Sequence, residues 1–151
     1  MYYDDLVPYH YNLPLELSDV FTIGWLSRTH KFRVGQVSQD ATEAMEELVA
    51  SSRTNKMRGY HLCEFCDSRE PIVIKHKSEQ IALGSAEIWI PSTGGIGVFA
   101  APDLVYHYVV AHMYLPPQDF INAVLAARNR SDWNPNHERQ IRVQAAFASR
   151  K

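Results

Sequence analysis

Apolar residues recur at helical spacing in several segments of the chain, and these segments predict most of its secondary structure. The clearest helix runs from Ser38 to Ser52, because Ser38 can cap it and its apolar positions share one face: Ala41, Met45, Leu48 and Val49. Two more helices are expected, from Pro102 to about Met113 and from Pro117 or Gln118 to about Arg128. A last helix of weak amphipathicity is expected over residues 138–149.

Strand periodicity appears in shorter runs before and between these helices. One strand is expected from Val20 to about Gly24, and another in the run from Pro71 to Lys75. Residues 86–90 and 96–100 both alternate, and the stretch between them is rich in turn residues, so they predict a β-hairpin. Together the patterns predict an α+β fold with a small antiparallel sheet and about three helices.

Length and composition are those of one globular domain. The chain has 151 residues, of which 46% are hydrophobic and 21% charged, enough to bury a core. We divide it into a domain over residues 1–128 and a basic C-terminal extension over residues 129–151. The most apolar stretch, residues 104–115, is interrupted by two histidines and is too short to span a membrane. The N-terminus lacks a positive region followed by an apolar run, so a cytoplasmic location is expected.

Charge is distributed unevenly along the chain. Residues 1–127 contain nine Lys and Arg against fifteen Asp and Glu, whereas residues 128–151 contain six against two. Residues 78–127 contain no Lys or Arg, and their acidic residues are Glu79, Glu87, Asp103 and Asp119. These four residues predict an acidic surface for a basic protein partner, whereas nucleic acid is expected to bind only weakly and only through the basic extension.

The sharpest chemical motif is Cys63-x-x-Cys66. Two thiolates at this spacing can hold one metal ion, and a pair of cysteines in a reducing compartment binds metal or does redox chemistry more often than it forms a structural disulfide. Downstream, His107 and His112 are separated by four residues, within the range of zinc ligands on helices. An ideal helix turns these two positions about 140° apart, so its last turn must loosen before both rings reach one ion. The four residues predict a structural zinc site.

Other interpretations of the motif stay open. His61 lies two residues before Cys63 and is an alternative ligand, because such positions point the same way in an extended segment. The thiols could also be buried core residues or a redox pair. The alternative function is a zinc-dependent hydrolase in which His61 and Glu64 lie near the metal. The helical His-Glu-x-x-His and nucleophile-elbow motifs are absent from the sequence, which favours a non-enzymatic role.

Longer motifs surround these residues: Tyr2-Tyr-Asp-Asp-Leu, Gly24-Trp-Leu with His30-x-Phe-x-x-Gly35, Arg58-Gly-x-His-x-Cys-x-x-Cys66, and Tyr106-His-Tyr-x-x-x-His-x-Tyr-x-Pro-Pro117. Over roughly residues 1–125 they resemble an uncharacterised family of small bacterial proteins. The resemblance implies a bacterial origin and a shared Cys/His set, but no activity. In size and charge such proteins are similar to immunity proteins, which neutralise a toxin by binding it. We therefore expect a protein-binding domain of the immunity or adaptor kind, with a basic toxin as the type of partner.

Overall fold

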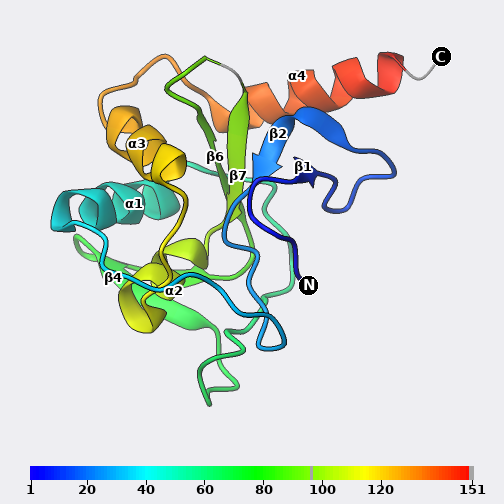
Figure 1. Cartoon of the computed structure of the whole chain (residues 1–151). Helices are drawn as coiled ribbons and strands as arrows, with labels where there is room; N and C mark the ends of the chain where they lie inside the picture. The colour runs from blue at the N-terminus through cyan, green and yellow to red at the C-terminus, as the bar shows by residue number, and fades with distance from the viewer. Residues whose placement is uncertain (96, 150–151) are drawn as a thin grey trace.

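A five-stranded mixed sheet stands at the centre of the computed structural model, which describes residues 1–95 and 97–149 (Figure 1). The strand order is β1-β2-β7-β6-β3, with the bounds β1 (Pro8–Tyr9), β2 (Leu17–Thr22), β7 (Val98–Pro102), β6 (Glu87–Pro91) and β3 (Arg53–Thr54). A separate antiparallel hairpin consists of β4 (Ile72–His76) and β5 (Glu79–Leu83). The described residues also form four helices, so the α+β prediction is confirmed.

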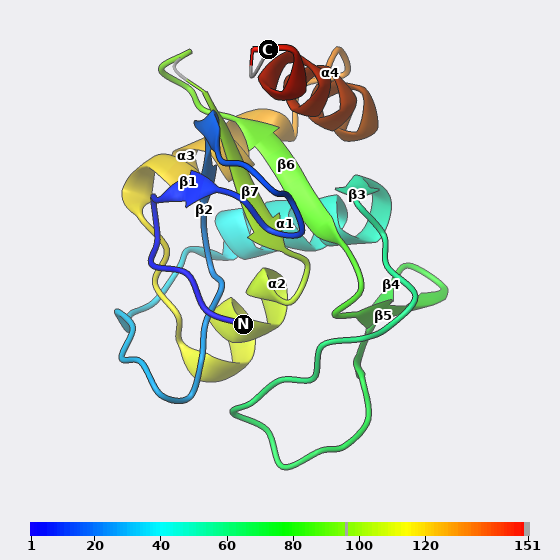
Figure 2. The same ribbon diagram turned by 90° about the vertical axis from the view of Figure 1, so that its right-hand side faces the viewer.

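The sequence pattern predicted an antiparallel sheet, whereas the central sheet is mixed. Strands β2 and β7 run parallel, with Val20 opposite Val98, whereas the other neighbours in this sheet are antiparallel. Parallel neighbours need a long crossover connection. Here the connection includes helix α1 (Gln39–Ser51), which lies on one face of the sheet (Figures 1 and 2). The predicted β6–β7 hairpin is present, although Ile96 lies outside the described residues.

The remaining helices follow the predicted order. Helix α1 begins where its cap predicted, because the Ala41 N–H donates to the Ser38 hydroxyl over 3.2 Å. Helices α2 (Val105–His112) and α3 (Gln118–Ala127) come next, and α4 (Pro135–Ala148) begins three residues earlier than expected, behind an Asn134 cap. Strands β1, β3 and β5 were not predicted from the sequence pattern.

The two faces of the sheet bury different residues. Alternation along β6 sends Ile88 and Ile90 into the main core, which is covered by α1, α2 and α3. The residue between them, Trp89, points to the other face and packs among the N-terminal aromatic residues, Tyr9, Tyr11 and Trp25. The N-terminal tyrosines of this cluster pack on the body: Tyr9 is fully buried and Tyr11 is 6% exposed.

Helix α4, in the basic extension, packs across this second face (Figure 2). The indole N–H of Trp133 donates to the Trp89 carbonyl over 2.7 Å, and Val143 packs against the aromatic cluster. Much of the basic charge is engaged within the molecule: Arg142 pairs with Asp19 and Glu138, Arg130 with Asp132, and Arg128 with Glu43 and Glu47. The last two residues of the extension lie outside the described residues.

Candidate metal centre

The two cysteines come from the long segment between β3 and β4, which hangs below the sheet (Figure 2). Two backbone hydrogen bonds attach this segment to the body: Met57 N–H donates to the Ser85 carbonyl and His61 N–H to the Gly84 carbonyl, over 2.6 and 2.8 Å. Gly84 permits this approach, because a Cβ there would lie 2.3 Å from the His61 carbonyl oxygen. Cys66 N–H then donates to the Cys63 carbonyl over 3.4 Å, which closes the turn between the two thiols.

The two histidines come from the C-terminal half of α2, where the helix widens. Residue Met113 adopts the left-handed conformation, with φ 59°, and its N–H bonds to the carbonyl of Tyr108, five residues back instead of four. Tyr114 N–H donates to the same carbonyl over 3.0 Å. This is the loosened last turn that the spacing of His107 and His112 requires, and the two Nε2 atoms approach to 3.2 Å.

The four side chains form a compact group whose ligand atoms all lie within 4.8 Å of one another. The Cys63 sulfur is 3.4 Å from His112 Nε2, and the Cys66 sulfur is 3.3 and 3.4 Å from His107 and His112 Nε2. Ordinary zinc bond lengths place the corners of a tetrahedron about 3.5 Å apart for a sulfur and a nitrogen, and about 3.3 Å apart for two nitrogens. The observed spacings match these edges, so the group is placed to hold a metal ion.

Burial shifts the pKa values of Cys63, His107 and His112 in ways that matter for a metal. It lowers the pKa of His107, which the neighbouring His112 lowers further, and it lowers the pKa of His112. Both shifts favour the neutral imidazole, which is the form that coordinates a metal. Burial also raises the pKa of the Cys63 thiol, so a bound cation must displace that proton.

Aromatic side chains pack beside the four ligands, and the sequence analysis did not predict this packing. Phe65, between the two cysteines, lies with its ring centroid 5.4 Å from that of His112 and 5.9 Å from that of Tyr108. Phe32 meets Phe65 edge-on from the segment after β2, at 5.3 Å. The sequence did contain one indication of this packing, because Phe65 lies between the two cysteines of the motif. The Phe65 ring therefore packs against His112, one of the four candidate ligands.

Comparison with known families places the chain among proteins that have no described activity. Residues 1–125 match a family described as a domain of unknown function, DUF7919. The chain belongs to this family. Comparisons with curated proteins and with solved structures give no match. The matched residues include all four members of the metal group, whereas α4 follows the match. Among the described residues, no helix is long and apolar enough to cross a membrane.

The two residues of the hydrolase alternative lie outside the metal group. His61 is instead a neighbour of the N-terminal aromatic cluster, since its Nε2 is 2.9 Å from the Tyr11 hydroxyl. The Glu64 side chain accepts a hydrogen bond from the Arg28 backbone N–H over 3.3 Å, and Arg28 also bonds to the Glu64 carbonyl. Both residues are exposed. Neither completes the metal group in this DUF7919 chain.

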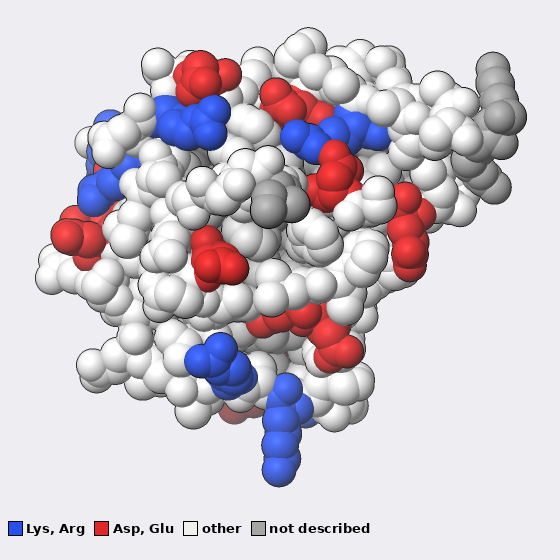
Figure 3. Space-filling view, turned by 45° about the horizontal axis from the view of Figure 1, so that its top comes forward, with Lys and Arg blue, Asp and Glu red and all other residues white. Residues whose placement is uncertain are grey.

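The four acidic residues predicted to form a partner-binding surface divide into two pairs. Glu79 and Asp119 are exposed, as a surface role requires. For Glu87 and Asp103 the prediction is wrong, because their exposed fractions are 1% and 0%. On the face drawn in Figure 3, acidic side chains are interspersed with Lys and Arg and form no continuous patch.

The buried pair has structural partners that explain its burial. Glu87 accepts hydrogen bonds from the Tyr9 hydroxyl and the Trp89 indole, at 2.8 and 3.0 Å, and from the Asn55 amide. Asp103 accepts from the Gly84 N–H over 2.7 Å and pairs with Arg53 over 3.3 Å. The burial of Glu87 could have been predicted from the alternation of β6, which puts this residue on the same face as Trp89.

Proposed function

We propose that this chain is a non-enzymatic protein-binding domain, stapled by one structural zinc ion. The observation that carries the proposal is the number of candidate ligands: four side chains offer ligand atoms within 4.8 Å of one another, and four of their separations are 3.2–3.4 Å. A structural zinc site is closed by four protein ligands, whereas a catalytic one keeps a position for water or substrate. Two thiolates with two imidazoles also favour zinc over the hard cations, which take oxygen ligands.

The binding role draws on the remaining surface. Residues 78–127 carry no Lys or Arg, and Glu79 and Asp119 are exposed within them. A partner with a basic surface would be steered toward such a region, and like-charged partners would be repelled. We propose a basic protein as the partner and an immunity or adaptor role in a bacterial cytoplasm, with toxin neutralisation by binding as the specific form. The analogy with immunity proteins extends to size and charge only.

Cobalt substitution distinguishes this proposal from the hydrolase alternative. We expect Co²⁺ to replace the native metal and to give the intense visible absorption of a four-coordinate site. Because a site closed by four protein ligands has no open position, azide in excess should leave the spectrum unchanged. A spectrum that shifts with azide in a saturable way would show an exchangeable position, and the structural assignment would give way to a hydrolase. Elemental analysis of protein purified without chelator should find about one zinc per chain.

The binding role is tested by charge reversal at the exposed acids. A partner is isolated from the native host with the tagged chain, purified, and tested for direct association by stopped flow. The double variant Glu79→Lys, Asp119→Lys should slow association by roughly tenfold at low salt, with a smaller effect at high salt. Asp132→Lys is the matched control, because Asp132 is exposed but lies outside residues 78–127, the acidic segment. Equal association rates for all three proteins would remove the acidic segment from the binding role.

A further inference from the structure

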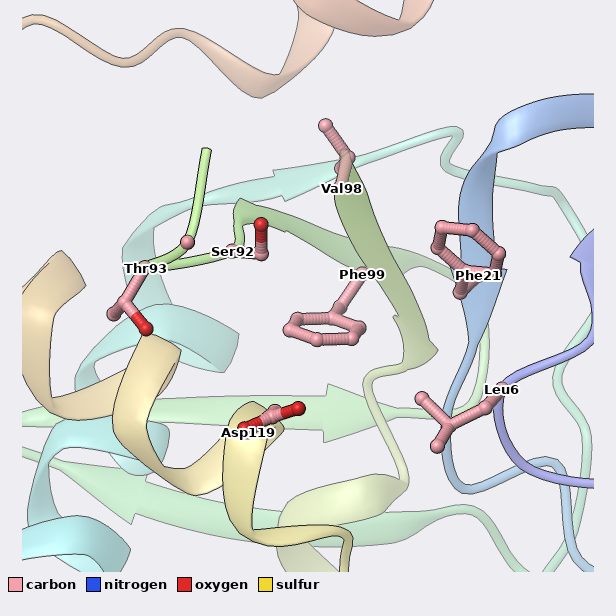
Figure 4. Close-up of a pocket in the computed structure, with 8 residues that line it drawn as sticks. Leu6, Phe21, Ser92, Thr93, Val98, Phe99 and Asp119 are labelled. Atoms are coloured by element: carbon pink, nitrogen blue, oxygen red, sulfur yellow. The ribbon is translucent and has the colours of Figure 1, made fainter. Parts of the chain in front are cut away.

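A pocket of about 380 Å³ opens beside the central sheet, at the start of α3 (Figure 4). This volume is at the lower end of the range for small-molecule sites. Its apolar walls come from three separate parts of the chain: Leu6, Phe21, Val98 and Phe99. Gly97 lets the sheet close tightly here, because a Cβ would lie 2.7 Å from the Asp19 carbonyl oxygen and 3.2 Å from the Phe21 ring. The sequence analysis named Leu6 only as the end of the motif Tyr2-Tyr-Asp-Asp-Leu and did not predict a pocket.

Asp119 supplies the charge at this otherwise apolar pocket. It lies in the first turn of α3, and Figure 4 shows its carboxylate facing the same space as the Phe99 ring. Its carboxylate has no hydrogen-bond or ion-pair partner among the described residues, and no other pocket-lining residue is charged. An anionic group beside two aromatic rings attracts a cation, by ion pairing and by the negative faces of the rings.

Leu6, which also lines the pocket, has a left-handed backbone conformation that is unfavourable for a residue with a side chain. Its φ is 66°, a region that costs a branched L-residue about 1–2 kcal/mol. The strained backbone is fixed by a hydrogen bond from Leu6 N–H to the Thr22 carbonyl, over 2.7 Å. The side chain nevertheless remains 47% exposed, so core burial does not account for the strain. Strained backbone conformations of this kind cluster at ligand-binding and other functional sites.

We infer that this pocket receives one basic side chain, a lysine or an arginine, from the partner protein. The methylene stem would lie between Leu6 and the Phe99 ring, and the charged head would meet the Asp119 carboxylate. This inference rests on the protein-binding function proposed above and names the chemistry by which the partner is recognised. It also assigns distinct tasks to the two exposed acids: Asp119 anchors the partner, whereas Glu79 acts only through long-range attraction.

The pocket can be tested without knowing the partner, using small mimics of the two side chains. The full, zinc-loaded chain is labelled with ¹⁵N and titrated with n-butylguanidinium, n-butylammonium and, as a neutral mimic of similar shape, n-butylurea. At least one cation should bind saturably and move the amide signals of Leu6, Phe21, Phe99 and Asp119. Butylurea should bind about tenfold more weakly, since it lacks the charge. The stronger of the two cations identifies the side chain.

Variants then separate the pocket from general charge effects. Asp119→Asn should weaken cation binding roughly three- to tenfold. Asp40→Asn is the matched control, because Asp40 is also an exposed acid in the first turn of a helix, and it should change nothing. Leu6→Ala should weaken binding of the cations and of butylurea alike. Equal binding of butylurea and the cations, signals that move elsewhere, or an Asp119→Asn variant that binds normally would each overturn the inference.

The outcomes also separate this inference from the proposed function. If the mimics fail to bind while the charge-reversed protein still associates slowly with its partner, the pocket is excluded and the binding role stands. If the mimics bind as described but charge reversal leaves association with the partner unchanged, the pocket stands as a cation site and the acidic segment loses its role in protein binding.

Discussion

His61 and His107 differ in their neighbours, although both were candidate ligands in the sequence. The His61 ring contacts the Tyr11 hydroxyl at the edge of the aromatic cluster, whereas His107 Nε2 lies 3.3 Å from the Cys66 sulfur. The spacing of the cysteines and helix histidines therefore predicted the group that the structure brings together, with His61 as an open alternative. The sequence could not decide between His61 and a helix histidine, because that choice depends on how two distant segments meet.

Removing each histidine in turn separates their roles. His107→Ala should weaken zinc binding by roughly 100-fold or more, because even residues that only orient ligands are worth 10- to 100-fold. His61→Ala should retain the affinity of the unmodified chain and serves as the matched control. Competition with a chromophoric chelator gives both affinities. A larger loss for His61→Ala than for His107→Ala would show that the cysteine segment supplies three ligands.

Glu87 is a second case in which one residue has a different role from the one its type suggests. Its carboxylate is buried among three donors, and the Arg139 guanidinium lies 5.9 Å from the neighbouring Trp89 ring. Burial raises the pKa of Glu87, while its hydrogen bonds and Arg139 lower it in part. The residue joins the sheet to the N-terminal segment and is inaccessible to a partner.

Truncating Glu87 should therefore destabilise the fold. Glu87→Ala leaves the Tyr9 hydroxyl, the Trp89 indole and the Asn55 amide without their acceptor, and should lower the free energy of unfolding by about 3 kcal/mol or more. Glu79→Ala, at an exposed site, should change it by no more than about 0.5 kcal/mol. Urea unfolding of zinc-loaded protein measures both. Equal stabilities would mean that the buried network contributes nothing.

At the scale of elements, local signals were predictable and long-range pairings were not. Helix α1 has its cap and its apolar face within one stretch of sequence, so the prediction of its start was accurate. Strands β1 and β3 have two residues each, too few for any periodicity to mark them, and β3 forms only through β6, which is distant in the chain. The parallel pairing of β2 with β7 likewise depends on a connection of some 75 residues, which periodicity does not describe.

Helix α2 was predictable in one respect and unpredictable in another. The spacing of His107 and His112 required a loosened last turn, but the way it loosens could not be predicted. The turn depends on Met113 adopting a positive φ and on the Tyr108 carbonyl accepting two N–H groups. A glycine would adopt this conformation without strain. The widened end is thus a property of the backbone that the Met113 side chain opposes.

Replacing Met113 tests this account of the helix end. Met113→Gly should keep the zinc and raise the free energy of unfolding by up to about 1 kcal/mol, because the left-handed conformation is no longer strained. Met113→Val should lower stability and weaken zinc binding, because a β-branched residue disfavours that conformation and displaces His112. The measurements are urea unfolding and chelator competition. Loss of zinc in Met113→Gly would show that the side chain itself holds the centre together.

For the whole molecule, the metal group joins two parts that are distant in the sequence and differ in regular structure. One is the segment between β3 and β4, which has no helix or strand of its own between residues 55 and 71. The other is the main core, in which Ile88, Phe99 and Phe120 are buried and which only Cys63 enters from that segment as a buried residue. A metal that bonds to Cys63 and Cys66 on one side and to α2 on the other is a cross-link between them, and removing it should affect the two parts unequally.

Chelation should therefore loosen the segment and spare the sheet. Hydrogen exchange of the zinc-free chain should be fast at the amides of Cys66 and of nearby residues in the segment, while those of β6 and β7 keep most of their protection. The loss of stability should be well below the approximately 10 kcal/mol that zinc contributes in peptide-sized domains, because a core of ordinary size remains here. Cys66→Ser should reproduce the exchange pattern without chelator. Restored protection after zinc is added back to the unmodified chain, but not to Cys66→Ser, would tie the effect to this site. A chelated chain that lost protection in every strand together would instead show that zinc governs the whole fold, as in domains that have no core of their own.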